Sequence, residues 1–109
     1  MTQENVKTVV DELREISEAA ITTAIAKLSP GAERLAETIV RAAKSRALVG
    51  QRYVMFLPND SQLKDGLNLD ASSSKDDRYL AGCAISKALS NLGFFSATFN
   101  DDNSISLSW

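Results

Sequence analysis

The first quarter of the chain carries apolar residues at helical spacing. They recur at steps of three and four residues: Val6, Val9, Val10, Leu13, Ile16, Ala20, Ile21, Ala24 and Leu28. This pattern predicts one amphipathic helix over residues 4–28. Its opposite face collects five acidic side chains between Glu4 and Glu18. We interpret that face as exposed to solvent, and acids early in a helix also interact favourably with the helix dipole.

The segment Ser29-Pro30-Gly31 interrupts this pattern. Ser29 can cap a new helix. Pro30 is favoured at the first helical position, because an N–H at that position has no hydrogen-bond partner within the helix. A second apolar stripe runs to about residue 48, and Gly50 can end the helix. The stripe comprises Leu35, Ile39, Ala42, Ala43 and Ala47. Because the connection is so short, we expect an antiparallel helical hairpin over residues 4–48.

The pattern in the middle of the chain predicts a strand followed by a loop. Residues 53–57 are all apolar, so a strand there would carry apolar side chains on both of its faces. This run predicts a strand that is covered on two faces and ended by Pro58. Residues 58–74 have the composition of a loop and are long for a compact domain. We expect this loop to be either a binding element or disordered.

A third helix and a β-hairpin are predicted after the loop. Ser74 with Asp77 three residues later marks a helix start, and Gly93 marks its stop. One apolar stripe lies between them: Ala81, Ala84, Ile85, Ala88, Leu89 and Leu92. Apolar and polar residues then alternate within residues 94–99 and within residues 104–109, on either side of the turn-forming residues 100–103. This alternation predicts two antiparallel strands joined by that turn.

Together these elements predict an α+β fold in one domain, residues 1–109. The N-terminal helical hairpin (4–48) is followed by a β-α-β-β unit (52–109), in which one helix covers a three-stranded sheet. At 109 residues with 44% hydrophobic content, the chain is long enough for one core of ordinary composition.

Composition excludes several chemistries. The chain has no histidine, so the commonest general base and the commonest transition-metal ligand are both missing. Cys83 is the single cysteine, which rules out an internal disulfide and a structural zinc site within one chain. Asp60, Asp65 and Asp70 could hold a magnesium ion, but their spacing misses the calcium-loop pattern. We therefore expect no enzymatic activity, no catalytic residues, no cofactor and no metal.

Targeting signals are equally sparse. The first sixteen residues are polar and acidic, unlike a signal peptide, and no apolar run approaches the ~20 residues of a membrane span. These observations predict a soluble, cytoplasmic protein that does not interact with membranes.

A basic window is the one local departure from an acidic composition. The formal net charge is −2, yet residues 38–59 hold no acid and four cations, one of them Arg41. The other three, Lys44, Arg46 and Arg52, could ring an anion, with Tyr53 near enough to stack on a base. The competing interpretation is that cations in the last turn of a helix complement its dipole and pair with another helix or subunit.

A second candidate surface lies on the third helix, where Tyr79, Leu80 and Cys83 fall outside the apolar stripe. They are too apolar for a free face, which predicts a contact with the helical hairpin or with another chain. The first helix, at ~25 residues of ~1.5 Å each, is also longer than so small a domain, so part of it should overhang. Its apolar arc spans about half the circumference, and self-association would bury the remainder.

Our leading hypothesis is a small non-enzymatic interaction protein, an accessory or regulatory factor acting by protein–protein binding as a homo-oligomer. Small accessory proteins of this kind are common in phages and mobile elements, although no residue here points to that origin. The alternative is an anionic-ligand binder, for nucleic acid or a nucleotide, using the local basic surface.

Overall fold

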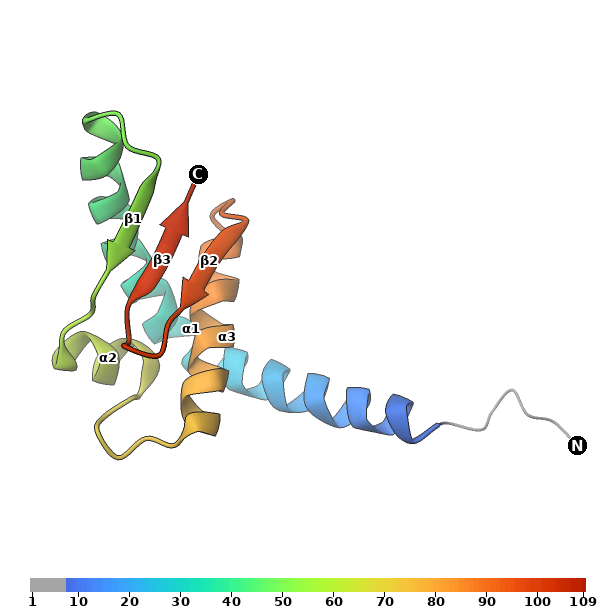
Figure 1. The fold of residues 1–109 in the computed structure, drawn as a ribbon. Coiled ribbons are helices and arrows are strands. Elements are labelled where there is room, and N and C mark those ends of the chain that lie inside the picture. The colour runs from blue at the N-terminus through green and yellow to red at the C-terminus, as the bar shows by residue number, and fades with distance from the viewer. Residues whose placement is uncertain (1–7) are drawn as a thin grey trace, which may run out of the picture.

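The computed structural model describes residues 8–109. This part of the chain forms, in order, α1 (Val9–Leu48), β1 (Tyr53–Phe56), α2 (Asp60–Leu67), α3 (Lys75–Ser90), β2 (Ser96–Phe99) and β3 (Ile105–Ser108) (Figure 1). Three helices and one three-stranded antiparallel sheet make an α+β fold, as the sequence predicts.

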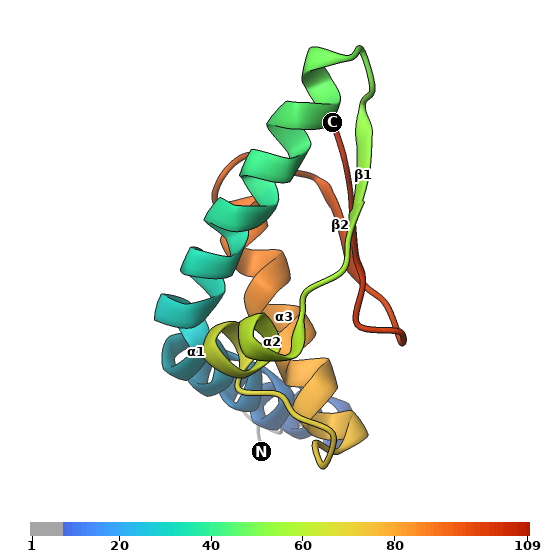
Figure 2. The same cartoon turned by 90° about the vertical axis from the view of Figure 1, so that its left-hand side faces the viewer.

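The expected helical hairpin is not formed, because residues 9–48 are one helix with Pro30 inside it. Proline has no N–H to donate to the carbonyl of residue 26, and its ring crowds that turn, so a helix kinks there. Figures 1 and 2 show the result as a change of direction between the blue and the green parts of α1. Ser29 does not cap a new helix; its hydroxyl donates to the Glu33 carboxylate over 3.4 Å.

Both ends of α1 have clear sequence signals. Thr8 caps the helix in a capping box with Asp11, and the first residues of the predicted helix, 4–7, lie outside the described part of the chain. The helix ends at Leu48, two residues before Gly50, whose φ of 84° is a left-handed conformation that suits glycine.

Gly31 has a packing role beside the proline. A Cβ atom built on Gly31 would lie 2.6 Å from the carbonyl oxygens of both Asp65 and Gly66. The backbone of α2 therefore rests directly on α1 at this point, a contact that only a glycine allows. Across the same contact, a Cβ on Gly66 would lie 3.1 Å from the Cβ of Leu35.

Residues 58–74 contain a helix that the loop prediction missed. Asn59 caps the start of α2 in a capping box with Gln62, and the helix ends at Leu67, followed by the C-cap residue Asn68 in the left-handed conformation with a φ of 54°. Leu63 and Leu67 turn inward and are buried. The second half of the chain is therefore β-α-α-β-β, and not the predicted β-α-β-β.

The last three elements follow the sequence prediction more closely. Ser74 and Asp77 form the capping box that begins α3. Strands β2 and β3 pair antiparallel, with Phe99 opposite Ile105 at the hairpin end. Strand β3 also pairs antiparallel with β1, which gives the sheet order β1-β3-β2.

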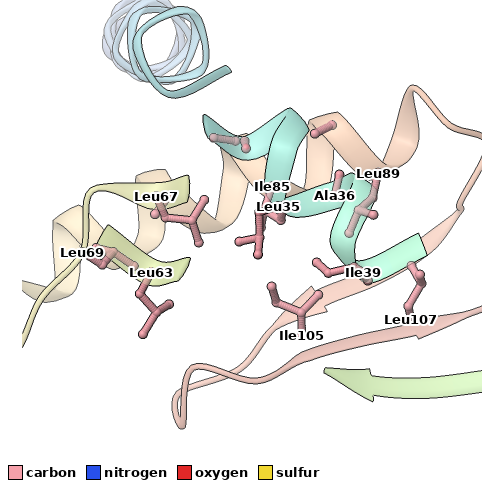
Figure 3. Packing of buried hydrophobic residues seen from close by; sticks show 14 of the residues in the cluster. Leu35, Ala36, Ile39, Leu63, Leu67, Leu69, Ile85, Leu89, Ile105 and Leu107 are labelled. Carbon is pink, nitrogen blue, oxygen red and sulfur yellow. The ribbon is translucent and has the colours of Figure 1, made fainter. Parts of the chain in front are cut away.

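The core lies between one face of the sheet and the helices behind it (Figure 2). In Figure 3, Ile39 of α1 faces Ile105 of β3, with Ile85 and Leu89 of α3 beside them. All four are buried. The strand predicted to be covered on two faces, 53–57, is covered on one: Val54 is buried, whereas Tyr53 and Met55 are 48% and 55% exposed. The physical reason is that the described helices pack on a single face of the sheet.

Candidate functional site

The first part of α1 projects from the body of the molecule as an arm, defined here as residues 9–28 (Figure 1). Every residue from 9 to 20 is exposed, and burial begins only at Ile21. The arm gives the described chain a radius of gyration of 16.8 Å and extents of 65 × 32 × 22 Å. A compact domain of this length has a radius of gyration of about 13 Å.

The arm exposes an apolar seam. Val9 is 70% exposed, Leu13 56% and Ile16 67%. At 100° per residue, these three and Ala20 fall within an arc of about 60°. The acidic side chains Asp11, Glu15 and Glu18 lie on the opposite side of the helix. Large aliphatic side chains collected on one side of a helix, with nothing from the same body over them, are typical of a protein-binding surface.

Two residues of the predicted anion site lie on different sides of α1. Lys44 and Arg46 are two positions apart on α1, which puts them about 160° apart around the helix. The Nη1 of Arg46 donates to Oε1 of Gln51 over 3.2 Å. Arg52 and Tyr53 follow at the start of β1, and both are exposed. The role of these four residues in anion binding stays a prediction.

The three interface candidates on α3 have different surroundings. Leu80 is partly buried and shares a hollow of about 180 Å³ with Ala24 and Leu28, at the corner between the arm and α3. Tyr79 is 64% exposed, and Cys83 is a half-buried free thiol. Leu80 therefore lies beside α1 of the same chain, whereas Tyr79 is exposed to solvent.

A hollow of about 590 Å³ lies beside α2. Asp60, Asp65 and Asp70 line it, together with Lys64. The Nζ of Lys64 lies 3.5 Å from Oδ2 of Asp70, and the two side chains form an exposed ion pair. Within residues 8–109, however, no group of three or more acidic, histidine or cysteine side chains is placed to hold a metal ion. The magnesium alternative therefore has no geometric support.

Two aspartates in turns are held by neighbouring serines. Ser72 donates from its hydroxyl and its backbone N–H to Asp70, and these bonds lower the pKa of that carboxyl. In the hairpin turn, Ser104 likewise donates from its hydroxyl and its backbone N–H to Asp102. These bonds lower the pKa of the Asp102 carboxyl, and the hydroxyl bond is the larger cause. Both aspartates stabilise turns, a structural role that needs no ligand.

The sequence candidates omit the residues that form the seam. The apolar pattern of Val9, Leu13 and Ile16 is visible in the sequence, and an overhang of the first helix is expected from its length. What the sequence does not reveal is which part of this apolar arc stays uncovered, because the predicted hairpin partner would cover some of it.

Comparisons with protein-family models, curated proteins and solved structures found no match for this chain. Among the helices of residues 8–109, none combines the length and the apolar character that crossing a membrane requires.

Proposed function

We propose that this protein is a non-enzymatic interaction factor, accessory or regulatory, that binds a protein partner through the seam of its arm. The observation that supports the proposal is the exposure of Val9, Leu13 and Ile16 on one side of a helix that projects from the body. The anionic-ligand alternative has no comparable arrangement of side chains behind it.

Burial of the seam supplies a driving force for binding. Full burial of one valine, leucine or isoleucine side chain is worth about 1.5–3 kcal/mol. Since these three are 56–70% exposed, a partner that covers them would gain about 1–2 kcal/mol from each side chain. The summed free energy of burial is large enough to support a binding surface, and it is small enough for the unbound chain to remain stable with the seam exposed.

The charge of the arm favours a protein over other apolar or anionic targets. Residues 9–18 carry four acids (Asp11, Glu12, Glu15 and Glu18) and one cation, Arg14, a net charge of −3. Nucleic acid and anionic lipid surfaces would both repel this segment, whereas amphipathic helices that bind membranes are usually basic on their polar face. A groove or a helix of another protein fits better.

Site-specific photo-crosslinking tests the proposal. A photoreactive residue is placed at Leu13 in the seam or, as the matched control, at Thr22 on the opposite side of the same helix, in the cells that produce the protein. We expect a covalent adduct with a protein from position 13 and a much weaker one from position 22. Equal labelling from both positions, or none from position 13, would refute the proposed function.

A further inference from the structure

We infer that the partner of the seam is the arm of a second copy of this chain, running antiparallel to the first. The inference rests on the proposed function and adds the identity and the orientation of the partner. It follows from three properties of the arm: the spacing of its apolar residues, the distribution of their sizes, and the distribution of charge.

The spacing is that of a helix that pairs with another helix. Val9, Leu13, Ile16 and Ala20 are separated by four, three and four residues, the spacing of the core positions of a coiled coil. The next position in the same series is Thr23, with Ala24 beside it. The series covers about 14 residues, or ~21 Å of helix, and lies within the arm.

The side-chain sizes favour the antiparallel orientation. The large residues Leu13 and Ile16 lie in the first half of the arm, and the small residues Ala20, Thr23 and Ala24 lie in the second half. In an antiparallel pair, core positions of opposite type face each other, so Ile16 meets Ala20 of the partner and Leu13 meets Thr23. Large against small keeps the two axes evenly spaced, whereas a parallel pair would crowd one end and leave gaps at the other.

The charges favour the same orientation. Residues 9–18 carry a net charge of −3, whereas residues 19–28 carry +1, from Lys27 alone. A parallel pair would place the two −3 segments side by side. An antiparallel pair places each of them along the +1 segment of the other chain, with Lys27 close to the acidic start of the partner's arm.

The corner of the molecule provides a place for the end of the partner's arm. In the register above, the partner's Val9 arrives at Lys27 and Leu28. Next to these residues lies the hollow of about 180 Å³ that Ala24, Leu28 and Leu80 line. This contact gives Leu80, a candidate on the third helix, a role in the interface. The seam is shorter than a standard protein interface, so we expect a reversible dimer.

Sedimentation equilibrium of the full chain tests the self-association. From about 5 µM to about 500 µM, a range around the micromolar affinity expected of a small interface, the average mass should rise towards twice that of the monomer. Leu13→Glu should raise the dissociation constant by more than about 100-fold, because it puts a carboxylate in each half of the seam. Thr22→Glu adds the same charge on the opposite side of the helix and should leave the dimer at nearly its original affinity.

Disulfide trapping tests the orientation, with Cys83→Ser in every variant. Leu13→Cys and Thr23→Cys chains, one of them isotopically labelled, are mixed and oxidised. The antiparallel pair predicts the mixed 13–23 disulfide. Two copies of residue 13 would lie ~15 Å apart, beyond the reach of a disulfide. A dominant 13–13 product would overturn the orientation.

The outcomes separate this inference from the proposed function. A wild-type chain that stays monomeric at about 500 µM contradicts self-pairing, since even a small interface should form at that concentration. If position 13 then crosslinks to a different protein in cells, the proposed function stands and the second-copy inference fails. If position 13 yields no adduct at all, both fail.

Discussion

Replacing Gly31 by alanine tests the contact that holds α1 against α2 just after Pro30. The new methyl group would lie 2.6 Å from the carbonyl oxygens of Asp65 and Gly66, distances that Cβ atoms do not show in proteins. Both oxygens belong to the backbone of one helix, so no side chain can rotate away. The methyl group fits only if α2 moves as a unit.

The size of the effect follows from two opposing terms. Overpacking of a tight site costs about 1–3 kcal/mol, and a contact with two backbone atoms belongs in the upper half of that range. Alanine also gains about 1 kcal/mol over glycine inside a helix. We therefore expect Gly31→Ala to lower the free energy of unfolding by about 1–2 kcal/mol, which corresponds to a fall in Tm of roughly 5–15 °C for a domain of this size.

Gly66→Ala is the matched control for this substitution. It brings the same gain in helix propensity, but its Cβ would lie 3.1 Å from the Cβ of Leu35, 3.2 Å from its Cδ2 and 3.4 Å from the Gly31 carbonyl oxygen, contacts that a shift of a few tenths of an ångström relieves. We expect Gly66→Ala to stay within about 1 kcal/mol of the wild type. Both variants are measured by urea unfolding at one fixed protein concentration of a few micromolar, because association would change apparent stability. A Gly31→Ala variant as stable as the wild type would refute the close approach of α1 and α2.

Three further predictions follow from the same structure. Leu13→Ala should change the stability of the monomer by less than about 0.5 kcal/mol in urea unfolding, whereas Leu35→Ala, at a site that is 4% exposed, should cost about 2–5 kcal/mol; similar losses would mean that the arm packs on the body. Asn59→Ala should cost about 1 kcal/mol through loss of the α2 cap, and no loss in the same assay would argue against α2. Ser104→Ala should raise the pKa of Asp102, measured by NMR titration, towards its ordinary value, because its two strongest bonds come from Ser104; an unchanged pKa would contradict this network.

The pH dependence that goes with Asp102 has a definite sign. Its pKa is lowered in the folded chain, so the serine bonds contribute stability above the ordinary aspartate pKa of about 3.9, and this contribution is lost as the pH falls through the folded value. The wild type should therefore lose stability below about pH 4 more steeply than Ser104→Ala does. Parallel curves for the two proteins would mean that the bonds do not distinguish the folded from the unfolded state.

Sequence patterns predicted those elements whose signals are local. The capping pair of Ser74 and Asp77 places the start of α3, and the alternation around residues 100–103 gives the β2–β3 hairpin. The same kind of signal exists for α2 in Asn59 and Gln62, followed by Leu63 and Leu67, but the polar composition of residues 58–74 concealed it. The cap residues and the two leucines four positions apart are together a local signal for a short helix.

Pro30 shows where local signals are insufficient. A serine-proline-glycine segment is compatible both with the end of one helix and the start of another and with a kink in a single helix. A tertiary contact accompanies the second arrangement: α2 packs on Gly31, one residue after the proline, within the continuous helix. The length of the first helix predicts an overhang and its wide apolar arc predicts self-association, but the expected hairpin leaves open which apolar residues stay uncovered.

Hydrogen exchange of the arm amides, followed as a function of protein concentration, tests the central claim most directly. A helical segment without tertiary contacts opens easily, so amides of residues 12–20 should exchange fast at a few micromolar, while those of α3 stay protected. At several hundred micromolar, the arm amides should become protected, whereas the α3 amides should keep the protection that they already have, because pairing covers the arm and reaches α3 only at the Leu80 side chain. Arm amides as protected as those of α3 at the lowest concentration would contradict an exposed binding arm.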